Sequence, residues 1–162
     1  EMTEKIRQYD MFRVEADKSK NIGAFSEFRW RVRAGGFLDN RSLPYYDFFH
    51  FNSQPIIFLL DDYQDAFMLP AYYSLSTPEF FGEVHMKYTT PYLLIKLLPI
   101  LSNTLLRENL SFSFLGSRYN KSYSEIGYSI SEILLIGEIG FYAGFENLKN
   151  KSVGVKMVFR FN

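Results

Sequence analysis

The 162-residue chain contains no cysteine and only two histidines. Without cysteine it forms no disulfide, and it offers neither a thiol nucleophile nor a thiolate ligand for zinc. His50 lies in an aromatic loop and His85 on the polar face of an expected strand, and neither has a second histidine or a carboxylate at metal-ligand spacing. A glycine-rich phosphate loop is also missing from the sequence. We therefore expect no metal, no cofactor and no enzymatic activity.

Net charge and long hydrophobic runs are missing as well. The 18 basic and 18 acidic residues balance, so the charge predicts no nucleic-acid partner. The most hydrophobic stretch, residues 92–106, contains Lys96 and Pro99 and falls short of the roughly 18–20 residues that a membrane-spanning helix requires. The sequence opens on charged residues rather than on a signal peptide. We therefore expect a mature form or a part of a longer protein.

Aromatic residues are unusually frequent. The chain has 17 Phe and 12 Tyr, and aromatic residues make up 19% of it. Such an excess fits either a very aromatic core or a lipid-facing surface with aromatic girdles at the membrane interfaces. The length suits a single domain, residues 1–162.

Alternation of hydrophobic and polar residues recurs along the chain and predicts antiparallel β-strands. Several of these stretches reach about 9–11 residues, the length of a tilted strand that crosses a membrane. Eight strands are predicted, at residues 11–17, 24–34, 66–75, 80–89, 109–117, 123–131, 136–146 and 152–161. The third is the least regular because Pro70 interrupts it, which an edge strand or a bulge would tolerate.

The connections between these strands differ in length. Residues 118–122 and 147–151 are predicted as short polar turns, whereas residues 35–65 and 90–108 are long connections. Leucines at positions 93, 94, 97, 98 and 101 make the second long connection amphipathic, which predicts a short helix against the barrel rim or the membrane interface. If the last strand ends at the periplasm, both long connections are expected on the periplasmic side.

Periodicity alone does not say which face of each strand points inward, because a soluble barrel or sandwich alternates too. Three features favour a barrel whose apolar faces contact lipid. Large residues fill nearly every apolar position, the polar faces mix Gly and Ser with opposed charges, and the last strand ends on an aromatic residue. We therefore predict an all-β fold, an antiparallel transmembrane β-barrel of about eight strands with a short amphipathic helix in a connection.

The last predicted strand ends on a candidate signal for insertion into the outer membrane. Its apolar face begins at Val153, and Gly154, Lys156 and Arg160 lie on the other face. The residues of the candidate insertion signal are Val155, Met157, Phe159 and Phe161. Asn162 displaces the terminal aromatic residue by one place from the end of the sequence.

Arg29, Arg31 and Arg33 share one face of the second predicted strand. At the membrane midplane each arginine would cost about 2–4 kcal/mol if it faced lipid, so this face is expected to point into the barrel. Glu15 and Glu27 lie on matching faces and would help to balance the charge. The predicted luminal charge network comprises Arg29, Arg31, Arg33, Glu83, His85, Lys87, Glu125 and Glu138. We favour a structural salt-bridge network that fills a narrow barrel; the alternative is an anion-selective lining or a site for an acidic ligand.

A serine hydrolase of the outer-membrane phospholipase kind is a further alternative. It would use His85 with Ser111 or Ser113. Both serines are explained more simply as polar side chains that fill the lumen, so this alternative is not favoured.

Three segments together resemble a known family. They are residues 69–77 (LPAYYSLST), residues 96–101 (KLLPIL) leading into residues 106–108 (LRE), and residues 122–133 (SYSEIGYSISEI). In this order, and followed by a final strand, they resemble the end of a Bacteroidota outer-membrane family of unassigned function, over roughly residues 10–161. Members of that family look like a carboxypeptidase-regulatory-like β-sandwich followed by a large barrel related to surface-antigen (BamA-like) barrels. The resemblance implies that the chain is the C-terminal half of a larger barrel, and it supplies no catalytic residues.

These observations predict a membrane-embedded module of a bacterial envelope protein, placed in the outer membrane. Its expected role is assembly, secretion support or anchoring, in contact with membrane lipid, the outer-membrane assembly machinery and other envelope subunits. One alternative is a porin-like conduit with an arginine-lined lumen. Another is a soluble barrel that binds a small ligand.

The insertion signal gives a direct prediction. Phe161→Ala removes the terminal aromatic side chain, so we expect less of the variant than of the unmodified protein in the outer-membrane fraction of expressing cells. Equal membrane levels of the two proteins would contradict the assignment of the signal.

Overall fold

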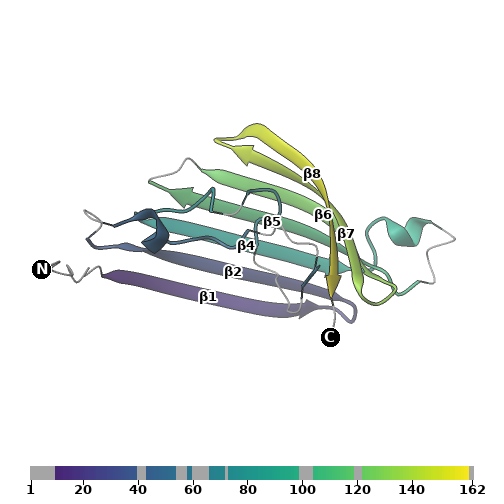
Figure 1. The fold of residues 1–162 in the computed structure, drawn as a ribbon. Helices are drawn as coiled ribbons and strands as arrows, with labels where there is room; N and C mark the ends of the chain where they lie inside the picture. The colour runs from purple at the N-terminus through teal and green to yellow at the C-terminus, as the bar shows by residue number, and fades with distance from the viewer. Residues whose placement is uncertain are drawn as a thin grey trace, which may run out of the picture.

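The computed structural model describes residues 10–39, 43–53, 58–59, 66–71, 73–98, 104–118 and 122–160. Eight strands form one sheet, with the spatial order β1-β2-β4-β5-β6-β7-β8-β3 (Figure 1). The strands are β1 (Met11–Ile22), β2 (Ser26–Phe37), β3 (Phe58–Leu59), β4 (Phe81–Thr90), β5 (Arg107–Ser117), β6 (Tyr123–Ile133), β7 (Gly137–Glu146) and β8 (Lys149–Arg160). Two 3₁₀ segments, η1 (Tyr45–Asp47) and η2 (Ile95–Leu97), are the helical elements within these described ranges.

The long strands pair in an antiparallel ladder, and each pairs with the next long strand along the chain. The two residues of β3 pair in parallel with the edge of β8 that does not pair with β7. The predicted all-β antiparallel architecture is therefore confirmed. The sheet is open rather than closed into a barrel: in the part of the chain that the structure describes, β1 pairs with β2 alone.

One predicted strand, residues 66–75, is wrong. Phe67 forms a single bridge with Ser53, and residues 68–70 and 73–75 are bends and turns, because Pro70 provides no backbone N–H for a ladder. This removes one crossing of the sheet. The β2–β4 connection (residues 38–80) and the β4–β5 connection (residues 91–106) consequently lie at opposite ends of the sheet, not at one end as expected.

In place of the amphipathic helix predicted in the β4–β5 connection, the described residues 91–98 and 104–106 contain η2, three residues long, and Leu101 lies outside the described residues. η2 lies at the end of the sheet where β8 finishes, and the turns at residues 23–25 and 134–136 lie at the same end. We call this the C-terminal end of the sheet. The β2–β4 connection and the turn between β7 and β8 lie at the other end.

The two faces of the sheet have opposite polarity, and the burial pattern is the reverse of that in a water-soluble sheet. Phe112 and Ile126 are cross-strand partners on one face, and they are 39% and 49% exposed. At the next position of the ladder, Ser113 and Glu125 are partners on the other face, beside His85; His85 is 4% exposed and Glu125 3%. The apolar side chains thus form a face that is exposed, which we call the outer face. The polar side chains form a buried face, which we call the inner face.

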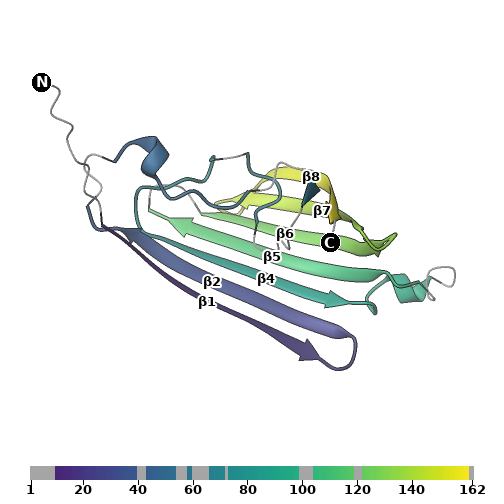
Figure 2. The ribbon, with the colours of Figure 1, turned by 60° about the horizontal axis from the view of Figure 1, so that its bottom comes forward.

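The β2–β4 connection covers the inner face (Figure 2). Phe51 and Phe67 of this connection pack against Phe81, Leu115 and Tyr123 of the sheet in one buried cluster. The Phe51 and Phe81 rings meet edge to face, with their centroids 4.9 Å apart. The connection therefore brings its own hydrophobic side chains to the polar face and shields that face from solvent.

Tyr142 on β7 lies on the inner face beside two glycines. Gly127 on β6 is its direct cross-strand partner, and Gly140 lies two residues before it on β7. A Cβ atom at Gly140 would lie 2.7 Å from the Tyr142 ring, and one at Gly127 would also collide with it. The glycines therefore make room for a buried aromatic ring that lies flat along the sheet.

We expect Gly127→Ala to lower the free energy of unfolding by about 1–3 kcal/mol, because the Tyr142 ring must move away. Gly82→Ala is the matched control: a Cβ atom there meets nothing within 4 Å, and its effect should stay within about 0.5 kcal/mol. Urea unfolding of both variants, followed by tryptophan fluorescence, measures the difference. Equal stability of the two variants would contradict the packing argument.

Candidate functional site

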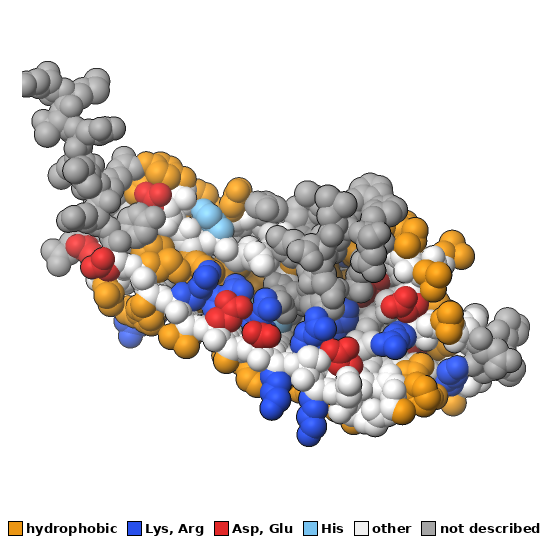
Figure 3. Space-filling model, turned by 90° about the horizontal axis from the view of Figure 1, so that it is seen from below, with side chains coloured by type: hydrophobic (Ala, Val, Ile, Leu, Met, Phe, Trp, Pro, Cys, Tyr) orange, Lys and Arg blue, Asp and Glu red, His pale blue; other side chains and the backbone are white. Residues whose placement is uncertain are grey.

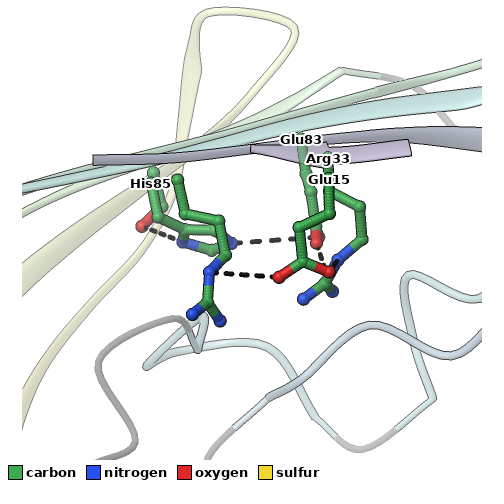
Figure 4. A network of polar contacts seen from close by, with 6 residues as sticks. Glu15, Arg33, Glu83 and His85 are labelled. Carbon is green, nitrogen blue, oxygen red and sulfur yellow. Dashed lines mark hydrogen bonds and ion pairs between the residues drawn. The ribbon is translucent and has the colours of Figure 1, made fainter. Parts of the chain in front are cut away.

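A continuous line of charged side chains crosses three strands, β1, β2 and β4, on the inner face (Figure 4). Glu15 on β1 accepts a hydrogen bond from Arg33 Nε at 3.1 Å and forms an ion pair with Arg31, whose Nε lies 3.2 Å away; both arginines are on β2. Arg33 also reaches Glu83 on β4 at 2.5 Å. Glu83 lies 3.8 Å from His85 Nε2. We call this set the arginine–glutamate network.

The local sequence explains this arrangement. Alternation places every second residue of each strand on the inner face, and the ladder register sets Glu15 opposite Arg33 and Arg33 opposite Glu83. Directly opposed side chains of unlike charge attract each other across the strands. Arg33 and Glu83 are both buried, so each needs the other to offset the loss of its hydration.

Charged side chains of both signs lie close together on this face (Figure 3). A second group of contacts lies nearer the C-terminal end of the sheet. Lys87 Nζ on β4 is 3.8 Å from Glu138 on β7, and Ser129 on β6 donates to Glu138 at 2.5 Å. Asn109 on β5 donates to Ser129 at 3.2 Å. These contacts join four neighbouring strands by polar side chains alone.

Two residues of the predicted charge network are engaged differently. Arg29 pairs with Glu27 of its own strand at 3.2 Å, on a more exposed part of the face. Glu125 accepts hydrogen bonds from the backbone N–H groups of Met68 at 2.8 Å and Leu69 at 3.0 Å. Glu125 therefore ties the β2–β4 connection to the inner face instead of pairing with an arginine.

The serine hydrolase alternative can be compared with this geometry. His85 Nδ1 lies 2.9 Å from Ser113 Oγ, and Glu83 is on the other side of the imidazole ring. A hydrolase requires a nucleophile that substrate can reach and a carboxylate that orients the base. Here Ser113 is 8% exposed, the Phe67 ring packs 4.9 Å from the His85 ring, and Glu83 is bound by Arg33. The arrangement favours a packed polar network over a catalytic triad.

The other histidine, His50, lies in the β2–β4 connection. His50 Nδ1 is 2.6 Å from Ser76 Oγ, and the imidazole ring meets the Tyr73 ring edge to face at 4.5 Å. Burial lowers the pKa of His50 and favours its neutral form. Over the described ranges, no three His, Asp or Glu side chains are placed to hold a metal ion.

Sequence reasoning missed Glu108, which lies on the outer face and is 0% exposed. It accepts hydrogen bonds from the backbone N–H groups of Leu93 at 2.8 Å and Leu94 at 2.7 Å, and from the Tyr128 hydroxyl at 2.6 Å. Leu110 lies on the apolar face, and strand alternation extended two residues toward the N-terminus would have placed the Glu108 carboxylate on the same face. A carboxylate there must be paired with donors.

The residues of the candidate insertion signal lie on β8. Val155 and Met157 are exposed on the outer face, and Phe159 follows on the same face. Phe161 lies outside the described residues. No helix in the described part of the chain is long and apolar enough to cross a membrane.

The arginine–glutamate network predicts a stability effect. Glu83→Ala removes the buried carboxylate beside Arg33 and His85 and leaves Arg33 with Glu15 as its acidic partner, so we expect a loss of about 3–5 kcal/mol in the free energy of unfolding. Glu27→Ala removes a more exposed partner and should cost at most about 1 kcal/mol. Denaturant unfolding of both variants checks this, and similar losses would argue against a buried network.

Comparisons with known proteins identify the family of this chain. No curated protein matches it, and no solved structure matches it. Residues 1–130 match the family described as "Family of unknown function (DUF5686) C-terminal domain". Since the match covers most of the 162 residues, the chain belongs to the C-terminal domain family DUF5686, whose function is unknown.

Proposed function

We propose that this chain is part of a β-barrel in a bacterial outer membrane, with the outer face against lipid and the inner face turned to the barrel interior. The observation that carries the proposal is the reversed polarity of the sheet. Exposed phenylalanine, isoleucine and valine side chains are stable against acyl chains, whereas in water they would form a large unpaired apolar patch.

The strand lengths support the proposal. β5 has 11 residues. At about 3.3 Å per residue and a tilt of about 35–45°, a strand of this size spans roughly 25–30 Å along the membrane normal, close to the height of the apolar band of such barrels. Both ends of the sheet would then lie near a membrane interface.

The open sheet supports a barrel with further strands beside β1. Bacterial barrels of one chain have an even number of antiparallel strands, and the described antiparallel ladder has an odd number, from β1 to β8 without the parallel β3. β1 also presents Arg13, Glu15 and Asp17 on its inner side, which continue the polar lining toward the missing neighbour. This fits the C-terminal part of a larger barrel, as the family resemblance implies.

The filled interior favours anchoring, assembly or secretion support as the role of the barrel. The buried networks and the β2–β4 connection occupy the inner face, which leaves an open channel disfavoured. Membrane lipid, the outer-membrane assembly machinery and other envelope subunits are the proposed partners. A porin-like conduit is the second candidate, supported by the partial exposure of Arg29 and Arg31.

Trp30 is the single tryptophan of the chain and tests the proposal. It lies on the outer face opposite Met86. In the full-length protein, with tryptophans elsewhere replaced and the protein reconstituted in vesicles, we expect phospholipids brominated deep in their acyl chains to quench Trp30 fluorescence.

The matched control moves the indole by one residue to the opposite face. In the double variant Trp30→Phe/Arg29→Trp, the same lipids should leave the fluorescence unchanged. Quenching of both tryptophans alike, or of neither, would overturn the proposed orientation of the sheet in the membrane.

A further inference from the structure

We propose that the β4–β5 connection and the β6–β7 turn form an interfacial collar, which contacts the phospholipid headgroups and upper acyl chains of one leaflet. The collar consists of Tyr92, Leu94, Leu97, Leu98, Leu134 and Leu135. The inference rests on the proposed function, because it requires the outer face to lie in a membrane.

The first observation is a change of polarity along the outer face. Toward the C-terminal end of the sheet this face carries Ser26, Thr90 and Glu108 in place of apolar residues. The Ser26 and Thr90 hydroxyl oxygens are 2.8 Å apart, and Thr90 and Glu108 are both buried. Polar groups at this depth need cover before the face can meet lipid.

The β4–β5 connection supplies the cover. The backbone N–H of Leu94 donates to Glu108 at 2.7 Å, and the backbone N–H of Tyr92 lies 3.4 Å from the Thr90 hydroxyl. Ile95, which belongs to the connection, is itself buried. The Tyr92 ring meets the Phe25 ring of the β1–β2 turn edge to face, with centroids 5.8 Å apart. The connection is thus held against the sheet by hydrogen bonds to Glu108 and Thr90 and by the ring contact with Phe25.

The collar presents apolar side chains on its outward side. Leu97 is 75% exposed, and Leu94 and Leu98 are exposed beside it. In the β6–β7 turn, Leu134 is 89% exposed, with a φ of 52°, and Leu135 has a φ of 71°. Positive φ values at a turn favour Asn or Gly, so turn chemistry does not explain two leucines there.

Two lysines on the outer face favour lipid as the occupant. Lys18 and Lys20 are exposed on the outer face of β1, opposite Trp30 and Phe28. Long lysine side chains beside aromatic rings reach from an apolar surface to headgroup phosphates. The collar continues this same face at the height of a membrane interface. Leucines that enter the headgroup boundary, on a face that also carries basic groups, match an interfacial segment.

The test places a single tryptophan in the collar. In a Trp30→Phe background, Leu97→Trp and Leu135→Trp are made in the full-length protein, again freed of other tryptophans and reconstituted in phosphatidylethanolamine–phosphatidylglycerol vesicles. An interfacial segment lies about 5–10 Å into the headgroup boundary, so bromine near the headgroup should quench both tryptophans about twofold more strongly than bromine near the chain end.

The outcomes separate the two proposals. If deep bromine quenches Trp30 in the parent protein but no brominated lipid quenches the collar tryptophans, and aqueous iodide does, the collar is wrong and the barrel proposal stands. If brominated lipids do not quench Trp30 either, both proposals fall.

A second variant pair tests the tether. Glu108→Gln removes the charge that holds the connection, so we expect lipid quenching of the Leu97→Trp variant to drop by about half or more, since hydrogen bonds to charged groups are the stronger ones. Glu132 lies on β6 at the same end of the sheet, and no hydrogen bond ties it to the β4–β5 connection in the described residues. Glu132→Gln should therefore leave the quenching unchanged. Equal quenching in both variants would overturn the role of Glu108 as the tether.

Discussion

The structure depends on pairing the charges of the inner face. A sheet that buries Arg33, Glu83 and His85 must match each donor and acceptor across neighbouring strands, because an unpaired ion there costs more than a lost hydrophobic contact. This requirement fixes the register, since a slip of one residue would send the charges to the outer face. The apolar face has no comparable constraint, as lipid or any other apolar medium accepts it in many arrangements.

Two buried glutamates perform the same task on opposite faces. Glu125 holds backbone N–H groups of the β2–β4 connection on the inner face, and Glu108 holds those of the β4–β5 connection on the outer face. In each case a carboxylate of the sheet accepts hydrogen bonds from consecutive backbone N–H groups of a segment whose described residues have little secondary structure. The long connections are therefore anchored by polar contacts at defined points, while their hydrophobic residues face a core or the exterior.

Alternation predicted most of the ladder, because period two is directly visible in sequences such as Leu110, Phe112 and Phe114. It failed at residues 66–75, where a similar pattern belongs to a connection whose Phe67 is buried by the sheet rather than by a partner strand. The same periodicity predicted which residues lie on the charged face. It did not predict which groups they contact, since Glu125 binds a segment more than 50 residues away in the sequence, and the fold brings the two together.

The pairing of each long strand with the next along the chain has a consequence for assembly. Every ladder between the long strands is a contact between neighbours in sequence, and apart from the β2–β4 and β4–β5 connections the long strands are joined by short turns. Loop closure therefore adds little entropy cost at each step, so the sheet can grow by zippering from its C-terminal hairpin toward β1. At each stage of such growth, the strand added last would be the edge strand whose backbone groups pair with the next strand. Among the described strands, β1 is the last to take this position.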